Sequence, residues 1–154
     1  MRYFLDTEFN GFGGELLSLA LVREDGASIY LLYTVPGNIA RWVATHVIPA
    51  LHAVPPWIEA RRVSQTEGAR ALGEFLGDDP DPEIVADWPD DISYFCRALM
   101  TGPGHMAPLH RLRFEMERLE SNPSALPGGS PHNAWWDAMA LRERVLRPPM
   151  RAQA

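Results

Sequence analysis

The sequence predicts a single α/β domain over residues 1–154, with a mixed sheet flanked by helices. Three observations lead to this class. Continuously apolar runs of strand length open the chain, which is typical of buried strands. Segments with the apolar spacing of amphipathic helices follow them, separated by one further short apolar run. The length of 154 residues and the apolar content of 46% suit one domain with one sizeable core.

The first part of the chain is expected to form an antiparallel meander. A Gly-rich turn over 11–14 and the hairpin signal Glu24-Asp25-Gly26 keep the connections between its three apolar runs tight. Pro36 and the residues after it end the third run. The expected strands are residues 2–9, 15–22 and 28–35.

The rest of the chain is expected to be mainly helical. Pro49 interrupts the first helical pattern, and Gly77 is placed to end the second. Residues 109–119 are ambiguous, because their start could be a short strand while Phe114, Met116 and Leu119 favour a helix. The expected elements are helices over 39–52, 66–76, 91–100 and 131–146, a strand over 83–86, loops over 78–82, 101–108 and 121–129, and a frayed tail after 147.

Composition leaves the choice of partner open. A formal net charge of −6 argues against nucleic acid, but many of the acids fall in clusters where a metal would offset them. All fourteen basic residues are Arg, the better bidentate ligand for phosphate. The single cysteine, Cys96, is expected to be a small buried side chain and fits a reducing cytoplasm. No signal peptide and no apolar stretch of about 20 residues is present, so we expect a cytoplasmic protein without a membrane partner.

Asp6 and Glu8 are the most informative residues. Strand side chains alternate, so residues two apart point the same way, and two carboxylates then lie side by side at the end of a buried strand. Such a pair is unfavourable unless a cation lies between its members. Hard carboxylate oxygens suit Mg²⁺ or Mn²⁺. A strand that simply ends in polar surface residues is the alternative, and two acidic clusters further along the chain weigh against it.

The second cluster, Asp87, Asp90 and Asp91, follows the expected strand over 83–86. Catalytic groups of open α/β sheets gather beyond strand ends, although at least one of these acids is expected only to cap a helix. The third cluster pairs His132 with Asp137. Asp is a poor former of helix interiors, so its place inside the last helix favours a functional role.

With these three motifs the sequence resembles the DEDDh 3′→5′ exonucleases, a superfamily that includes polymerase proofreading subunits, ribonuclease T and oligoribonuclease. Leu5-Asp6-Thr7-Glu8 matches the first motif, Asp91-Ile92-Ser93-Tyr94-Phe95 is similar to the second, and His132 with Asp137 matches the third. The first motif and the Gly-rich turn after it look most like the small stand-alone bacterial exoribonucleases. Phe9 departs from the pattern, since many members have Thr there, and Asp90 and Asp87 remain rivals of Asp91.

The resemblance implies a ribonuclease H-like fold and a two-metal hydrolysis of phosphodiester bonds. It implies that Asp6 bridges two Mg²⁺ or Mn²⁺ ions, that Glu8 and Asp137 hold the ion carrying the nucleophilic water, and that Asp91 supports the second ion. His132 would be the general base. The implied substrate is RNA or a short single strand with a free 3′ end, and homodimers are common among members of the superfamily.

Geometry adds one requirement for the third motif. Five residues along a regular helix turn about 140°, so His132 and Asp137 cannot share a helix face. His132 is therefore expected at an irregular helix start or in the loop before it. The other histidines, His46, His52, His105 and His110, are expected to be ordinary surface or core residues.

Aromatic and basic side chains supply the candidates for substrate contacts. Phe9 and Phe12 are the preferred platforms for a terminal base, an interaction worth roughly 1–3 kcal/mol. Trp135 and Trp136 are expected in the core. The pairs Arg61-Arg62 and Arg111 with Arg113 are candidate phosphate contacts, although an exposed solvated face is the more ordinary role.

Two other functions compete with an active exoribonuclease. A proofreading or accessory subunit acting on DNA would need a docking segment, and no long extra tail is apparent. A non-catalytic nucleic-acid-binding relative would have little reason to keep four carboxylates and the histidine, because unpaired buried acids destabilise a fold.

Overall fold

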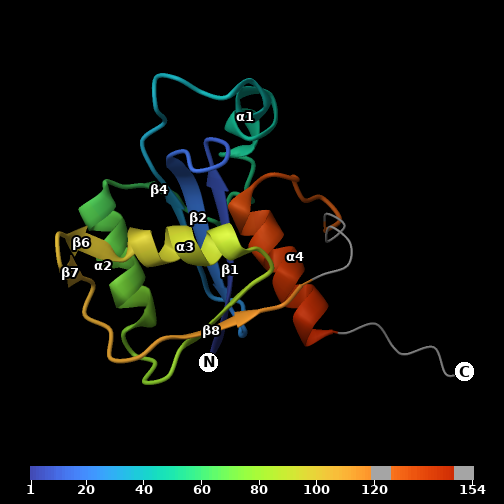
Figure 1. Cartoon of the computed structure of the whole chain (residues 1–154). Helices are drawn as coiled ribbons and strands as arrows, with labels where there is room; N and C mark the ends of the chain where they lie inside the picture. The colour runs from blue at the N-terminus through green and yellow to red at the C-terminus, as the bar shows by residue number, and fades with distance from the viewer. Residues whose placement is uncertain (119–125, 148–154) are drawn as a thin grey trace, which may run out of the picture.

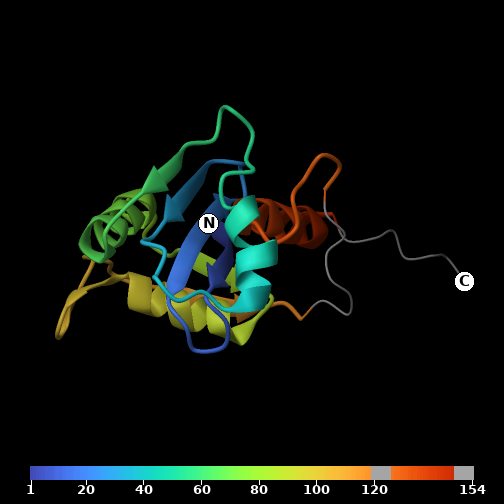
Figure 2. The same ribbon diagram turned by 90° about the horizontal axis from the view of Figure 1, so that it is seen from above.

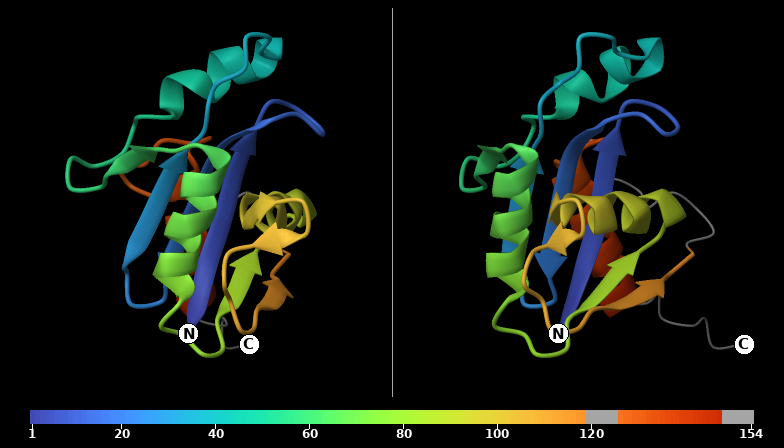
Figure 3. Two further views of the ribbon diagram at one scale, coloured as in Figure 1. Left: turned by 90° about the vertical axis from the view of Figure 1, so that its left-hand side faces the viewer. Right: turned by 60° about the vertical axis from the view of Figure 1, so that its left-hand side comes forward.

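The computed structural model describes residues 1–118 and 126–147. A six-stranded mixed sheet forms its centre, in the order β4-β3-β2-β1-β5-β8 (Figure 1). Its strands are β1 (Arg2–Phe9), β2 (Leu16–Arg23), β3 (Ser28–Leu32), β4 (Ala60–Arg62), β5 (Glu83–Ala86) and β8 (Arg113–Met116). β2 is antiparallel to β1 and β3, and every other neighbouring pair is parallel. The carboxyl ends of β1 and β5 therefore lie side by side at the same end of the sheet (Figure 3).

Helices cover both faces of this sheet. They are α1 (Arg41–His46), α2 (Gln65–Leu76), α3 (Pro89–Ala98) and α4 (Ala134–Leu146), with a 3₁₀ turn, η1 (Ile48–Ala50), after α1. The sheet lies between α4 on one side and α2 and α3 on the other (Figure 2). Alternation along β1 divides the core accordingly, because Leu5 packs with Leu72 of α2 and Phe95 of α3. Phe4, on the opposite face, packs with Leu141 of α4.

The N-terminal meander and the strand over 83–86 are confirmed. β3 ends at Leu32, earlier than predicted, and the helix expected over 39–52 consists of α1 and η1, with Pro49 inside η1. The second helix ends before Gly77, as predicted. The last helix begins at Ala134 rather than 131.

Several predictions about short elements were wrong. The preference for a helix within 109–119 fails, because residues Arg113–Met116 pair with β5 as strand β8. The loop expected over 101–108 contains a hairpin of β6 (Met100–Gly102) and β7 (His105–Met106), and β4 was missed altogether. Strands of two to four residues carry too little alternation to be recognised. Of the predicted loop over 121–129, residues 121–125 lie outside the described residues, as does the tail from 148 on.

Two further findings concern solvent and membrane. Cys96 is exposed on α3, so the prediction of a buried thiol was wrong. Its place on the helix falls on the face that turns away from the sheet, where packing does not reach. Among the described helices, none has the length and apolar character needed to cross a membrane.

Candidate active site

A cavity of about 380 Å³ opens at the carboxyl ends of β1 and β5, and acidic side chains line it. β1 contributes two of them from the same face of the strand, and one more follows β5 directly. The other two come from the first turns of α3 and α4. The five lining carboxylates are Asp6, Glu8, Asp87, Asp91 and Asp137.

These carboxylates form two groups that share Asp6. The first group joins Asp6 to Asp87 and Asp91, and the second joins it to Glu8 and Asp137. Within each group, one carboxylate oxygen from every residue lies within 4.8 Å of the others. Hard oxygen ligands at this spacing fit Mg²⁺ or Mn²⁺ better than softer metals. The cluster around Asp6 could therefore hold a metal ion.

Burial raises the pKa of every carboxyl group in the cluster, and repulsion from neighbouring acids adds to the rise for all of them except Asp87. Burial raises the pKa of Asp6 well above its ordinary range, and the charges of Asp91 and Glu8 raise it further. For Glu8, burial and then the charges of Asp137 and Asp91 raise the pKa to about 8. Burial also raises the pKa of Asp91 to about 7 and that of Asp137 to about 6. A bound divalent cation would offset this repulsion, so the donor set and its charge both fit a metal.

Thr7 positions Asp91 through two hydrogen bonds. Its side chain lies on the face of β1 opposite to Asp6, and both its hydroxyl and its amide donate to Asp91 Oδ1. Asp90, in contrast, accepts from Trp88 Nε1 at 3.1 Å and belongs to neither group. The structure thus brings Asp91 and Asp87 together with Asp6. The N-cap residue of α3 is Trp88, and its side chain makes no capping bond, so none of these acids is the cap itself. Asp90 lies in the first turn, where its charge favours the helix dipole, as the capping interpretation also expected.

The start of α4 explains how His132 and Asp137 come to line the same cavity. Asn133 caps the helix, its Oδ1 accepting from the amides of Trp135 and Trp136 at 3.1 and 3.2 Å. His132 precedes the cap with a φ of 59°, the only positive value of a non-glycine residue in the described part of the chain. The prediction that His132 lies outside the regular helix is confirmed. Asp137 lies in the first turn and not in the helix interior, and an acid is favourable there.

Asn133 is a site component that the sequence did not reveal. Its side chain is fully buried, and Nδ2 donates to the Ala50 carbonyl at 2.8 Å and to Tyr30 Oη at 3.2 Å. Tyr30 in turn donates to the Leu51 carbonyl at 2.8 Å. The start of α4 is thereby attached to β3 and to the segment after α1. Asn before a helical pattern is a local signal for the cap. The bonds to Ala50 and Tyr30 have no such signal, because these partners lie more than eighty positions away.

Aromatic side chains also line the cavity. The Trp42 ring on α1 stacks on His46 with centroids 4.5 Å apart, and it meets His132 edge-on at 4.9 Å. Trp42 is half-exposed and lines the cavity with Val43. His46 lies 6.3 Å from His132, centroid to centroid, so it is a neighbour of the site. The sequence does signal the contact between Trp42 and His46, because residues four apart lie on the same face of a helix.

The two phenylalanines proposed as base platforms differ in position. Phe9 lines the cavity and stacks on Tyr94, with centroids 4.6 Å apart and an interplanar angle of 21°. Phe12 lies at the turn between β1 and β2, is 96% exposed, and does not line the cavity. Trp135 is buried, as predicted, and Trp136 is half-buried.

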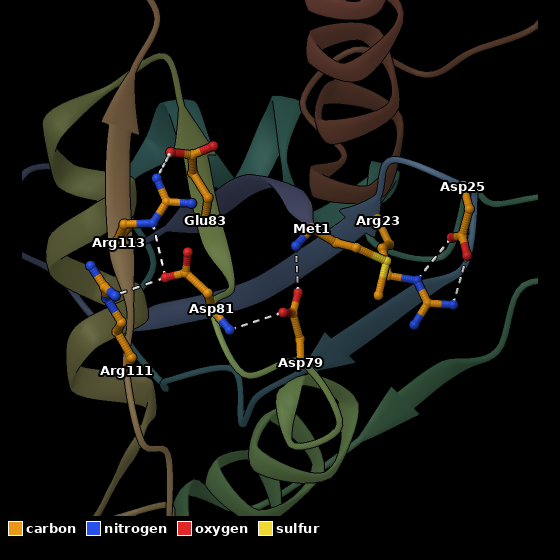
Figure 4. Close-up of polar contacts among 8 residues, drawn as sticks. All are labelled: Met1, Arg23, Asp25, Asp79, Asp81, Glu83, Arg111 and Arg113. Carbon is orange, nitrogen blue, oxygen red and sulfur yellow. Dashed lines mark hydrogen bonds and ion pairs between the residues drawn. The ribbon is translucent and has the colours of Figure 1, made fainter.

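The arginines singled out as phosphate contacts lie elsewhere. Arg113 pairs with Asp81 at 3.0 Å and with Glu83 at 2.7 Å, and Arg111 pairs with Asp81 at 3.2 Å (Figure 4). These pairs lie at the start of β5, at the end remote from the acids. Arg61 and Arg62 are exposed on the edge strand β4. No arginine of residues 1–118 and 126–147 lines the cavity.

No protein-family model matches the chain, and no curated protein matches it.

Proposed function

We propose that this protein is a metal-dependent 3′→5′ exonuclease that acts on RNA or short single-stranded nucleic acid. One observation carries the proposal: Asp6 belongs to two separate groups of three carboxylates in a single cavity. Hydrolysis by two metal ions uses two neighbouring cation positions, and Asp6 would help to hold both. A ribonuclease H-like fold, a cytoplasmic location and a homodimer belong to the same proposal, and the mixed sheet with helices on both faces supports the first of these.

In this mechanism the chain holds the ions and moves a proton. Two Mg²⁺ or Mn²⁺ ions, when bound, supply the charge that stabilises the attacking and leaving oxygens of the phosphodiester. Asp6 would contribute to both positions, with Glu8 and Asp137 holding one ion and Asp87 and Asp91 the other.

His132 lines the same cavity as the acids. It accepts the proton of the attacking water through an imidazole nitrogen and is the general base.

The walls of the cavity favour the end of a single strand. A volume of about 380 Å³ suits one nucleotide and not a duplex. Phe9 and the half-exposed Trp42 offer ring faces on which a base can stack, without preference for its identity. Phe12, exposed at the nearby turn, can reach only a nucleotide outside the cavity.

End-labelled RNA tests this proposal. With Mg²⁺ or Mn²⁺, a 5′-labelled single strand should yield a ladder of shortening products, while a 3′-labelled strand should release labelled mononucleotide from the first turnover. Excess EDTA should abolish both reactions. Asp6→Asn should lose several orders of magnitude in rate, whereas Asp78→Asn, an exposed acid outside the cavity, should keep the wild-type rate. Turnover in EDTA, or internal cleavage without release from the 3′ end, would refute the proposal.

A further inference from the structure

The candidate site contains a marked imbalance of charge. Five carboxylates line the cavity and no arginine of the described residues does, although the proposed substrate is a polyanion. Ions bound among the acids would contact the phosphate being cleaved. The neighbouring phosphates of the strand would still meet an acidic rim, unless a cation lies at the mouth of the cavity.

Arg118 lies next to a residue of the cavity lining, Trp88. Arg118 follows β8 by two residues, and its guanidinium carbon is 4.9 Å from the centroid of the Trp88 ring. Trp88 is half-exposed, follows Asp87 directly and lines the cavity. A guanidinium group that lies over an indole face keeps its N–H edges available for hydrogen bonding.

Arg118 forms no ion pair with an acid of the described ranges, because no carboxylate there lies close enough. Arg113, on the same strand, is in contrast engaged by two acids.

We propose that Arg118, held over the Trp88 ring, binds a backbone phosphate of the substrate at the mouth of the cavity. This inference rests on the proposed function, because it assumes a nucleic-acid strand whose end lies among the acids. Guanidinium binds phosphate through two parallel N–H···O bonds, and the indole face orients the group before the substrate arrives. The alternative is that Arg118 only offsets the charge of Asp87.

Binding measurements decide between these two roles. A 5′-fluorescein-labelled RNA of five nucleotides is titrated in Mg²⁺, by fluorescence anisotropy, with His132→Ala and with His132→Ala/Arg118→Ala. The His132→Ala background slows hydrolysis during the titration. Arg118→Ala should weaken binding about ten-fold. It should also reduce the slope of log K against log[salt] by roughly 0.7, the value for one phosphate contact on a single strand.

Matched variants separate a phosphate contact from general effects. Arg118→Lys keeps the charge but loses the planar group, so it should recover only part of the affinity. Arg70→Ala removes an equal charge from the exposed surface of α2 and should change neither affinity nor slope. In the presence of the catalytic histidine, Arg118→Ala should raise KM and leave kcat within about two-fold.

The outcomes distinguish the role of Arg118 from the proposed function. Equal affinity and equal salt slope with and without Arg118 would overturn its role as a phosphate ligand, even if the enzyme degrades RNA. A wild-type protein that binds RNA but never degrades it would overturn the proposed function, while the comparison of affinities still decides the role of Arg118. Absence of binding in both variants would overturn both.

Discussion

Thr7 donates two hydrogen bonds to one oxygen of Asp91, from its hydroxyl at 2.6 Å and from its amide at 3.1 Å. The two residues are 84 positions apart, one on β1 and one in the first turn of α3. Both bonds are buried, and they hold α3 against the end of the strand that carries Asp6 and Glu8. The residue between the two acids of the first motif therefore positions the acid of the second.

Replacing Thr7 tests this link. Thr7→Val keeps the shape and the amide bond but removes the hydroxyl donor, so the pKa of Asp91 should rise further, because hydrogen bonds to a carboxylate stabilise its charged form. We expect kcat/KM at pH 7 to fall about ten-fold, the effect of one lost charge-assisted hydrogen bond. Higher Mn²⁺ concentrations should restore part of it. Thr7→Ser should stay near wild type, and a serine variant as impaired as the valine variant would contradict the assignment.

The raised pKa values predict an unusual dependence of stability on pH. A carboxyl group whose pKa is higher in the folded state than in the unfolded state stabilises the fold while it is protonated, and this contribution is lost as pH rises through the folded pKa. With values of about 8 for Glu8, about 7 for Asp91 and about 6 for Asp137, the Tm in EDTA should fall between pH 5 and pH 8.

Two comparisons check the cause. Glu8→Gln should flatten the dependence of Tm on pH. Mn²⁺ should raise the Tm most at pH 8, where the acids are ionised and the cation stabilises only the folded state. A Tm in EDTA that rises steadily from pH 5 to pH 8 would contradict the repulsion among these acids.

His132→Ala should lower kcat by roughly 10²–10⁴-fold, the contribution of a general base. KM should change little, because the side chain acts on the water and not on the strand. His105→Ala, in the exposed hairpin of β6 and β7, is the matched control and should match wild type. Wild-type rates from pH 6 to 8 in the His132 variant would show a purely structural residue.

Asn133→Ala should lower both stability and activity. The change removes a helix cap, which costs about 0.5–2 kcal/mol. It also removes the hydrogen bond to the Ala50 carbonyl, which still accepts from the Ala53 amide, so the further cost is about 0.5–1.5 kcal/mol.

Asn133→Ser separates these two contributions. It restores the cap without the bonds to Ala50 and Tyr30, so its free energy of unfolding in urea should fall between wild type and the alanine variant. Its kcat should stay below wild type, because the position of His132 depends on where the bonds from residue 133 hold the backbone. A serine variant with full activity would show that the cap alone positions His132.

Much of the site was predictable because its signals are local. The alternation of a strand puts Asp6 and Glu8 on one face whatever surrounds them, and the helical period excludes His132 from the face of Asp137. Tight turns at Glu24-Asp25-Gly26 make neighbouring strands pair. Each of these inferences needs only a few consecutive residues.

What the sequence by itself determined is therefore the N-terminal meander, the main helices and the carboxylates of the three motifs. Only the tertiary structure decided that Asp87 joins Asp6 and Asp91, that Asn133 ties α4 to Tyr30, and that residues Arg113–Met116 form a strand. These outcomes depend on which distant segments pack together. Contacts between segments 30 or more positions apart leave no periodic pattern in either segment, because the surface against which each side chain packs comes from another part of the chain.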